Sequence, residues 1–224
     1  MKLLLVRHGN TFEAGETPVR VGANEDLPLT AAGENQAHAL ASQLKASAIR
    51  PDLFVCGPLK RTRRHTEIVI ADIAAPGAAE IDPRLTEIDY GAWGGMSDSD
   101  IIARFGPAAA RELEAWEKES RWPTESARWM PGAETVMRNL RGLTAELEAR
   151  MDADETALVC SSNGIMRYFL ELTRDGLTGH QAAGKAKMAT GAVSMLDVTD
   201  GAARVLFWNV AAGAPLPDGN QGAG

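Results

Sequence analysis

The sequence is poor in the features that mark secreted and membrane-spanning proteins. Its 224 residues include two cysteines, Cys56 and Cys160, which are too few for a disulfide framework. Each of them closes an apolar run, which favours buried free thiols. No apolar stretch approaches the roughly 20 residues of a membrane span. The apolar run before Arg7 is also too short for the core of a signal peptide, so we expect a cytoplasmic protein that makes no membrane contact.

Positive charge is also scarce. The chain has 23 lysines and arginines against 30 aspartates and glutamates, which gives a formal net charge of -7. No broad cationic surface is therefore available to release counterions from DNA, RNA or anionic lipid. We expect no nucleic-acid partner. The composition still allows a small anionic substrate, provided that a few positive side chains gather at its binding site.

What the sequence does have is an alternation of strand-like and helix-like segments. Apolar runs without alternation are typical of strands covered on both faces, and turn residues Asp200 and Gly201 between two apolar runs indicate a hairpin. We predict an α/β fold of three layers: a mostly parallel sheet with helices on both faces and an antiparallel edge hairpin near the C-terminus. The expected strands cover 2–6, 52–56, 157–161, 193–198 and 203–208, and the expected helices 30–44, 59–73, 132–151 and 163–172.

The domain organisation follows from the same pass along the chain. We predict a single domain over 1–210, in which 96–131 is a helical insertion that covers the site. With the adjacent Trp93 this region holds four of the five tryptophans, and we expect these side chains to anchor the insertion to the body. Residues 211–224 have little to bury, so we expect a disordered tail there.

Candidate chemistry appears where the first strand ends. In open α/β sheets ligands bind at the carboxyl ends of strands, and Arg7, His8 and Gly9 stand at that position. Arginine offers a fork of donors to phosphate oxygens, neutral histidine can attack phosphorus, and glycine lets a backbone approach closely. The three residues together indicate phosphoryl transfer, and the alternative is an ordinary surface Arg-His pair.

Two further candidates follow the next strand. The helix that begins near Leu59 carries an island of basic residues, most of which we interpret as a solvated face. Arg61 is the exception, because it lies in the first turn beside the expected site. Glu87 precedes a glycine-rich turn, where a carboxyl group can protonate a leaving oxygen. The alternative for Glu87 is a surface carboxylate.

Six segments of the chain, in order, resemble the histidine phosphatase superfamily in its phosphoglycerate-mutase-like branch. They are LLLVRHGNT, RVGANEDLPLTAAGENQA, GPLKRTRRHT, LTEIDYGAWGG, MPGAETVMRNL and VCSSNGIMR, and they span nearly the whole chain. The resemblance implies that His8 is a nucleophile that forms a phosphohistidine, and that Arg7 and Arg61 bind the phosphoryl group. Glu87 matches the general acid, and Gly22 lies where a backbone amide faces the substrate. The implied substrate is a small-molecule phosphomonoester, and neither a metal ion nor a cofactor is implied.

The sequence departs from this family where the third strand ends. The family usually has a second catalytic histidine there, and this chain has Ser162, followed by Asn163. None of the other three histidines, His38, His65 and His180, is an obvious replacement. Ser162 can cap the next helix, whose open amides can bind an anion, so we keep Ser162 as a catalytic candidate and Asn163 as a phosphate-binding candidate.

Several functions remain in competition. The first is an active phosphatase with an altered phosphate clamp, and the second is an inactive module that binds phosphate or a partner. A cysteine phosphatase is disfavoured, because Cys160 and Arg167 have six residues between them and Cys56 and Arg61 have four, and neither spacing closes the required loop. A mutase is disfavoured because RHGN and GGMSDSD depart from the mutase-like patterns. If the protein is a phosphatase, the sequence leaves four substrate classes open: sugar phosphates, phosphorylated cofactor precursors, phosphoamino acids and phosphopeptides.

Overall fold

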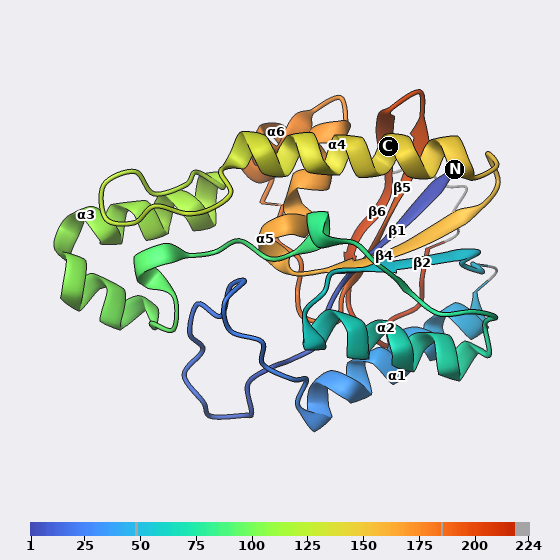
Figure 1. The fold of residues 1–224 in the computed structure, drawn as a ribbon, viewed down its shortest axis with the longest axis horizontal. Coiled ribbons are helices and arrows are strands. Elements are labelled where there is room, and N and C mark those ends of the chain that lie inside the picture. The colour runs from blue at the N-terminus through green and yellow to red at the C-terminus, as the bar shows by residue number, and fades with distance from the viewer. Residues whose placement is uncertain (48, 185, 218–224) are drawn as a thin grey trace.

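The fold is a six-stranded sheet between layers of helices (Figure 1). A computed structural model describes residues 1–47, 49–184 and 186–217. The strands are β1 (Lys2–Arg7), β2 (Leu53–Cys56), β3 (Glu80–Ile81), β4 (Thr156–Ser161), β5 (Val193–Thr199) and β6 (Ala202–Val210). Their order across the sheet is β3-β2-β4-β1-β5-β6, with β1 to β4 parallel and β5 and β6 antiparallel. The predicted α/β class is confirmed.

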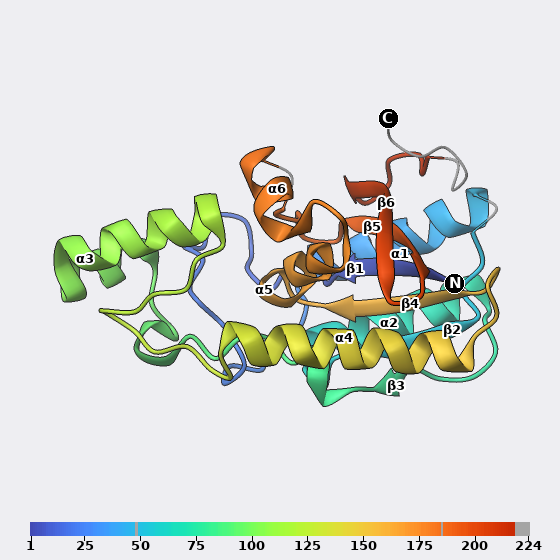
Figure 2. The ribbon, with the colours of Figure 1, turned by 90° about the horizontal axis from the view of Figure 1, so that it is seen from above.

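Helices cover both faces of the sheet. Helices α1 (Ala31–Ala46) and α2 (Lys60–Ile73) lie on one face, and α4 (Ala133–Arg150), α5 (Asn163–Met166) and α6 (Gly176–Ala182) lie on the other (Figures 1 and 2). Side chains of β1 alternate between the two layers, because Leu3 and Leu5 pack in the α4 core and Leu4 and Val6 in the α1 and α2 core. All four are buried, as expected for a strand covered on both faces.

The last two strands form the predicted hairpin. β5 pairs antiparallel with β1 and with β6, so the parallel part of the sheet ends at β1. The turn between β5 and β6 contains Asp200 and Gly201, with φ of +52° and +73°. Positive φ at both turn residues suits the right-handed twist of the strands, which explains why an Asp-Gly pair stands there.

The insertion consists of α3 (Asp98–Glu119) and an extended return to α4. α3 begins with a capping box, in which Ser97 and Asp100 satisfy each other's backbone amides, and it bends at Gly106, where φ is +74°. Figure 2 shows α3 projecting beyond the end of the sheet. The ring of Trp129 contacts four other aromatic rings at centroid distances of 4.8 to 5.5 Å, those of Tyr90, Trp93, Trp116 and Trp122. The tryptophans therefore anchor the insertion to the body.

Two segments differ from the sequence prediction. Residues 163–172 form one α-helical turn followed by a 3-10 helix (Arg167–Leu172), not a single α-helix. Residues 211–217, expected to be disordered, lie against α1, because Gln43 donates to the carbonyl oxygen of Ala211 at 2.9 Å and Leu216 packs on the core. Residues 218–224 of the expected tail lie outside the described residues.

Among the helices of the described residues, none combines the length and the apolar character that a membrane crossing requires.

Candidate active site

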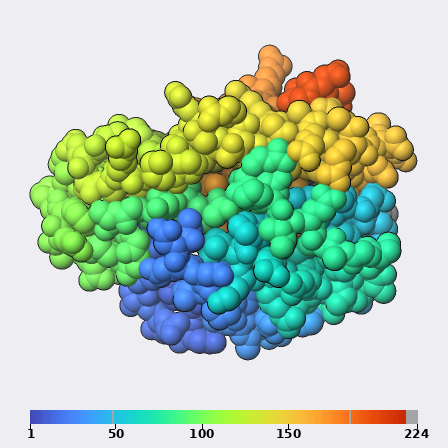
Figure 3. All heavy atoms as spheres, in the orientation of Figure 1, coloured from blue at the N-terminus to red at the C-terminus, as the bar shows by residue number. Residues whose placement is uncertain are grey.

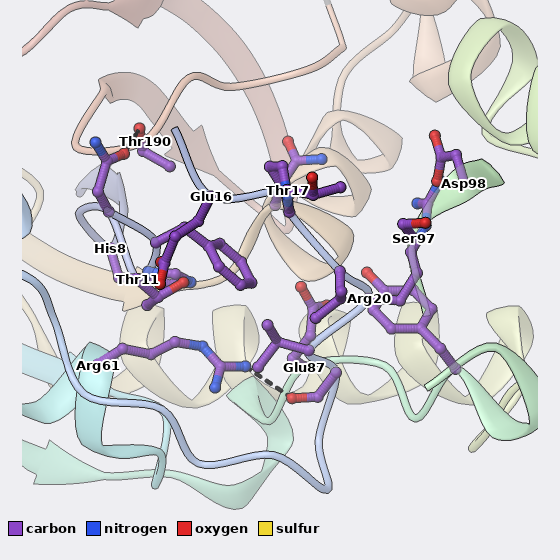
Figure 4. A pocket seen from close by; sticks show the side chains of 18 of the residues that line it. His8, Thr11, Glu16, Thr17, Arg20, Arg61, Glu87, Ser97, Asp98 and Thr190 are labelled. Carbon is purple, nitrogen blue, oxygen red and sulfur yellow. Dashed lines mark hydrogen bonds and ion pairs between the residues drawn. The ribbon is translucent and has the colours of Figure 1, made fainter. Parts of the chain in front are cut away.

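A cavity of about 810 Å³ opens at the carboxyl end of β1. Its walls come from the loop after β1, the first turn of α2, the segment around Glu87 and the insertion (Figure 4). In the space-filling view the loop (dark blue) lies beside the insertion (green) on one face of the molecule (Figure 3). Ser162 is not among the lining residues. The cavity does bring together six of the seven predicted site residues, which are Arg7, His8, Gly22, Arg61, Glu87 and Asn163.

His8 follows β1 directly, and its amide donates to the carbonyl oxygen of Ser161 at 3.0 Å. Its Nδ1 lies 2.7 Å from the carbonyl oxygen of Gly9. A carbonyl only accepts, so Nδ1 carries the proton and Nε2 carries the lone pair. Burial, with smaller effects from the Arg61 and Arg7 guanidinium groups, lowers the pKa of His8 well below its usual value. The ring is therefore neutral and suited to nucleophilic attack at neutral pH.

Gly9 also connects His8 to a second histidine. The Gly9 amide donates to Nδ1 of His65 at 3.1 Å, and burial lowers the pKa of His65 to about 4. A side chain at position 9 has no room, because a Cβ there would lie 2.3 Å from the carbonyl oxygen of Gly33. The sequence interpretation left His65 without a role. The signal that identifies it is its i+4 spacing from Arg61, which puts both side chains on one face of α2.

Arg61 is buried, although it belongs to a run of basic residues. Its Nη2 donates to the carbonyl oxygen of Gly22 at 2.8 Å and its Nη1 to that of Glu25 at 2.9 Å. Gly22 lines the cavity and contacts Arg61 through its carbonyl oxygen, and the expected role of its amide stays a prediction. Arg64, one turn further along α2, is half exposed and pairs with Glu34 at 2.6 Å. The solvated-face interpretation holds for Arg64.

Arg7 approaches His8 from the end of β1. Its Nη1 donates to the carbonyl oxygen of Met188 at 2.5 Å, and its buried Nε has no hydrogen-bond partner among the described residues. Burial lowers the pKa of Arg7 and of Arg61, and the negative charge of Glu87 opposes that shift at both. Because an arginine starts from so high a pKa, both guanidinium groups stay charged. They supply two positive charges at one end of the cavity.

Glu87 is held at the same end by two backbone amides. Its Oε1 accepts from the amide of Ile88 at 2.9 Å and its Oε2 from the amide of Gly164 at 3.3 Å. A Cβ on Gly164 would lie 2.3 Å from Oε1 of Glu87. Glycine at position 164 therefore makes the space that this carboxyl group occupies, a role that the sequence interpretation did not assign.

Ser162 and Asn163 open α5. The carbonyl oxygen of Ser162 accepts from the amides of Ile165 and Met166 at 3.1 and 2.9 Å, as the predicted capping position requires. Its side chain makes no capping bond, and its buried Oγ lacks a hydrogen-bond partner among the described residues. The capping prediction is thus correct for the backbone and wrong for the side chain. Asn163 lines the cavity, and its Oδ1 accepts from the amide of Met188 at 3.0 Å.

The sequence as a whole matches a known family. The sequence model of the histidine phosphatase superfamily (branch 1) matches residues 3–211. The chain belongs to the histidine phosphatase superfamily. A 2,3-bisphosphoglycerate-dependent phosphoglycerate mutase from Methylobacterium sp. (strain 4-46) is 30% identical over 181 residues, which cover 79% of this chain and 81% of that protein. The predicted family and its phosphoglycerate-mutase-like character are confirmed.

Solved structures of this superfamily share the fold. A mycobacterial glucosyl-3-phosphoglycerate phosphatase superposes with a TM-score of 0.76 at 23% identity, covering 94% of this chain and 99% of that one. A putative alpha-ribazole-5'-P phosphatase from Escherichia coli K-12 superposes with a TM-score of 0.72 at 22% identity, covering 97% and 99%. At this identity the likeness establishes the histidine phosphatase fold, and the reaction has to be argued from the site.

Proposed function

We propose that this histidine phosphatase hydrolyses phosphomonoesters through a phosphohistidine at His8, without a metal ion. One observation carries the proposal: a neutral His8, with its lone pair on Nε2, shares a cavity with Arg7, Arg61 and Glu87. The two guanidinium groups neutralise the charge on the transferred phosphoryl group, which is the main task of a site for this reaction.

In the first step Nε2 of His8 attacks phosphorus and the bond from phosphorus to the ester oxygen breaks. Glu87, which carries a proton once the phosphomonoester is bound, gives that proton to the ester oxygen, so the alcohol leaves neutral. The proton on Nδ1 of His8 stays bonded to the carbonyl oxygen of Gly9, which stabilises the positive charge that forms on the ring.

In the second step water attacks the phosphohistidine. The Glu87 carboxylate, formed in the first step, takes a proton from the water as the new bond to phosphorus forms. The bond from phosphorus to Nε2 breaks, inorganic phosphate leaves, and His8 and Glu87 return to their starting protonation states.

With Ser162 in place of a second histidine, the site has fewer side chains that can bind the phosphoryl oxygens. Its Oγ is buried behind the cavity lining, so it contributes no charge to the phosphoryl oxygens. The nucleophile, the acid and both arginines remain, which supports a reduced rate and argues against an inactive phosphate-binding module.

A second candidate is phosphotransfer to another alcohol, since the 30% identical relative is named a phosphoglycerate mutase. A mutase must protect its phosphohistidine from water. It must also bind the acceptor, a phosphoglycerate, which carries a carboxylate. The described cations of the cavity outside Arg7 and Arg61 already pair with carboxylates, which favours hydrolysis here.

Acid-sensitive labelling tests the nucleophile. Protein mixed with a ³²P-labelled aryl phosphate and quenched in base should retain label that is stable to alkali and lost in acid. His8→Ala should remove the label and the turnover. His38→Ala is the matched control, because His38 is half exposed on α1 and pairs with Asp72, and it should retain both. Turnover in His8→Ala would refute the mechanism.

Competition between water and alcohol separates the two candidate activities. Added glycerol or phosphoglycerate should receive no more than a minor share of the label, and inorganic phosphate should be the main product. Transfer of most of the label to phosphoglycerate would establish the mutase alternative. Phosphate binding without label on His8 would establish the binding module.

A further inference from the structure

The end of the cavity away from His8 is lined by charged side chains to which the hydrolysis mechanism gives no role. Figure 4 shows Arg20 and Asp98 across the cavity from His8 and Arg61. This end is where the loop after β1 meets the insertion, since the amide of Arg20 donates to the carbonyl oxygen of Met96 at 3.0 Å. The alcohol part of a bound phosphomonoester would extend towards these groups.

The cations at this end are already paired. Nη2 of Arg20 lies 2.9 Å from Oδ1 of Asp98, and its Nη1 lies 3.8 Å from Oε1 of Glu117. Nζ of Lys187 lies 2.8 Å from Oε2 of Glu117. In the described lining, Arg20 and Lys187 are the cations outside the phosphate end, so each of them is engaged by a carboxylate.

Carboxylates outnumber these cations. Glu13 and Glu16 also line the cavity, and neither forms an ion pair with a described residue. Oε2 of Glu16 accepts from the amide of Glu13 at 2.7 Å, which keeps the two residues together in the loop. Over the whole cavity, apart from His8, Arg7, Arg61 and Glu87, the described lining therefore holds four carboxylates, which include Asp98 and Glu117, and two cations, an excess of two negative charges.

We infer that the site selects phosphomonoesters whose alcohol part carries no negative charge, and that it favours an alcohol with a positive charge. A carboxylate or a second phosphate on the alcohol would have to displace Asp98 from Arg20 or Glu117 from Lys187, and would meet the remaining carboxylates. An ammonium group would gain from the same field. Phe12 and Trp116 offer apolar walls for the carbon skeleton. The inference rests on the proposed hydrolase, whose site it describes further.

Three aryl phosphates with a common ring test the selectivity. They carry an aminomethyl, a hydroxymethyl or a carboxyl group at the position opposite the ester. We expect kcat/KM to fall in that order, with about tenfold or more between the ammonium and the carboxylate compounds at low salt and a smaller ratio at high salt. Equal values, or a preference for the carboxylate, would overturn the inference.

Substitutions of the paired carboxylates test which side chains cause this selectivity. Asp98→Asn combined with Glu117→Gln frees Arg20 and Lys187, and should reduce the ratio between the ammonium and carboxylate compounds by about tenfold. Glu114→Gln is the matched control, because Glu114 lies on the same helix, pairs with Lys118 and does not line the cavity. It should leave the ratio unchanged, and an unchanged ratio in the double variant would contradict the inference.

A binding measurement keeps this test separate from that of the hydrolase proposal. The three corresponding arylphosphonates cannot be hydrolysed, and calorimetry should rank their affinities in the same order. Loss of turnover on every phosphate with this affinity order retained would refute the hydrolase proposal alone. Turnover with no affinity order would refute the selectivity alone.

Discussion

His65 makes the stability of this protein depend on pH in a way that two substitutions can isolate. The ring is fully buried, and Nδ1 accepts the Gly9 amide at 3.1 Å. Its pKa is about 4 when folded and near 6.5 when unfolded, so the unfolded chain binds the proton first as pH falls. The contribution of His65 is therefore fully present above pH 6.5 and is lost as pH falls towards 4.

The size of the loss follows from the two pKa values. At pH 4.5 the unfolded ring is almost fully protonated and the folded ring is mostly neutral, which costs roughly 2.5 kcal/mol of unfolding free energy relative to pH 7.5. His65→Asn offers Oδ1 near the position of Nδ1 and does not titrate. We expect it to match the native protein at pH 7.5 and to be more stable by about 2.5 kcal/mol at pH 4.5.

His65→Leu separates the hydrogen bond from the titration. It leaves the Gly9 amide buried without an acceptor, so it should lose about 1–3 kcal/mol at every pH and also move the His8 ring. Urea unfolding at several pH values measures the stability, and the kcat of an aryl phosphate at pH 7.5 measures the position of His8. We expect kcat to be retained in His65→Asn and reduced in His65→Leu. Parallel pH curves for the native protein and His65→Asn would refute the reasoning.

Three further substitutions test the remaining groups of the site. Arg61→Ala should weaken binding of vanadate by about tenfold to a hundredfold, the value of a charge-assisted bond, and Arg64→Ala on the exposed face should change it by less than about threefold; equal losses would contradict the burial of Arg61. Glu87→Gln should slow hydrolysis of alkyl phosphates by about a hundredfold or more but that of p-nitrophenyl phosphate much less, since that leaving group needs no proton; a uniform loss would remove the acid role. Gly164→Ala should show the same selective loss, because its Cβ would displace the Glu87 carboxyl group, and correctly folded protein with unchanged rates on both substrates would contradict the contact.

Local patterns in the sequence predicted most of the fold. The strands β1, β2 and β4 are apolar on both faces, and Thr30 caps α1 by accepting the amide of Gly33 at 3.1 Å, as the residue type indicates. The two-residue strand β3 was not predicted, because its residues are exposed and its pairing with β2 depends on a neighbour far away in sequence. The contact of Gln43 with the chain after β6 is missed for the same reason, since 168 residues separate the partners.

The candidate site likewise contains residues that the sequence predicts and one that it does not. Arg7, His8, Arg61 and Glu87 stand at the ends of predicted strands or beside predicted turns, where residue type and position both carry information. His65 is one of five basic or histidine residues among the six at 60–65, where composition favours a solvated face and only the helical spacing from Arg61 indicates burial.

Ser162 stands where the family resemblance predicts a histidine, and its neighbour Ser161 provides a control. Both Ser161 and Ser162 are buried at the end of β4, but Oγ of Ser161 donates to the carbonyl oxygen of Leu85 at 2.7 Å and Oγ of Ser162 has no partner among the described residues. Ser161→Ala should therefore lose about 1 kcal/mol of unfolding free energy, and Ser162→Ala should be neutral or slightly stabilising.

Two substitutions of Ser162 test whether its hydroxyl group takes part in catalysis. If its hydroxyl stays behind the cavity lining, Ser162→Ala should retain kcat within about threefold, because no bond to the phosphoryl group is lost. Ser162→His should raise kcat by about tenfold to a hundredfold where the ring reaches the phosphoryl oxygens, since one charge-assisted hydrogen bond is worth roughly 1.5–3 kcal/mol. Steady-state rates on p-nitrophenyl phosphate, with urea unfolding as the check on folding, measure both. Loss of turnover in a correctly folded Ser162→Ala variant would show that the hydroxyl contacts the substrate, and the proposed mechanism would then have to include it.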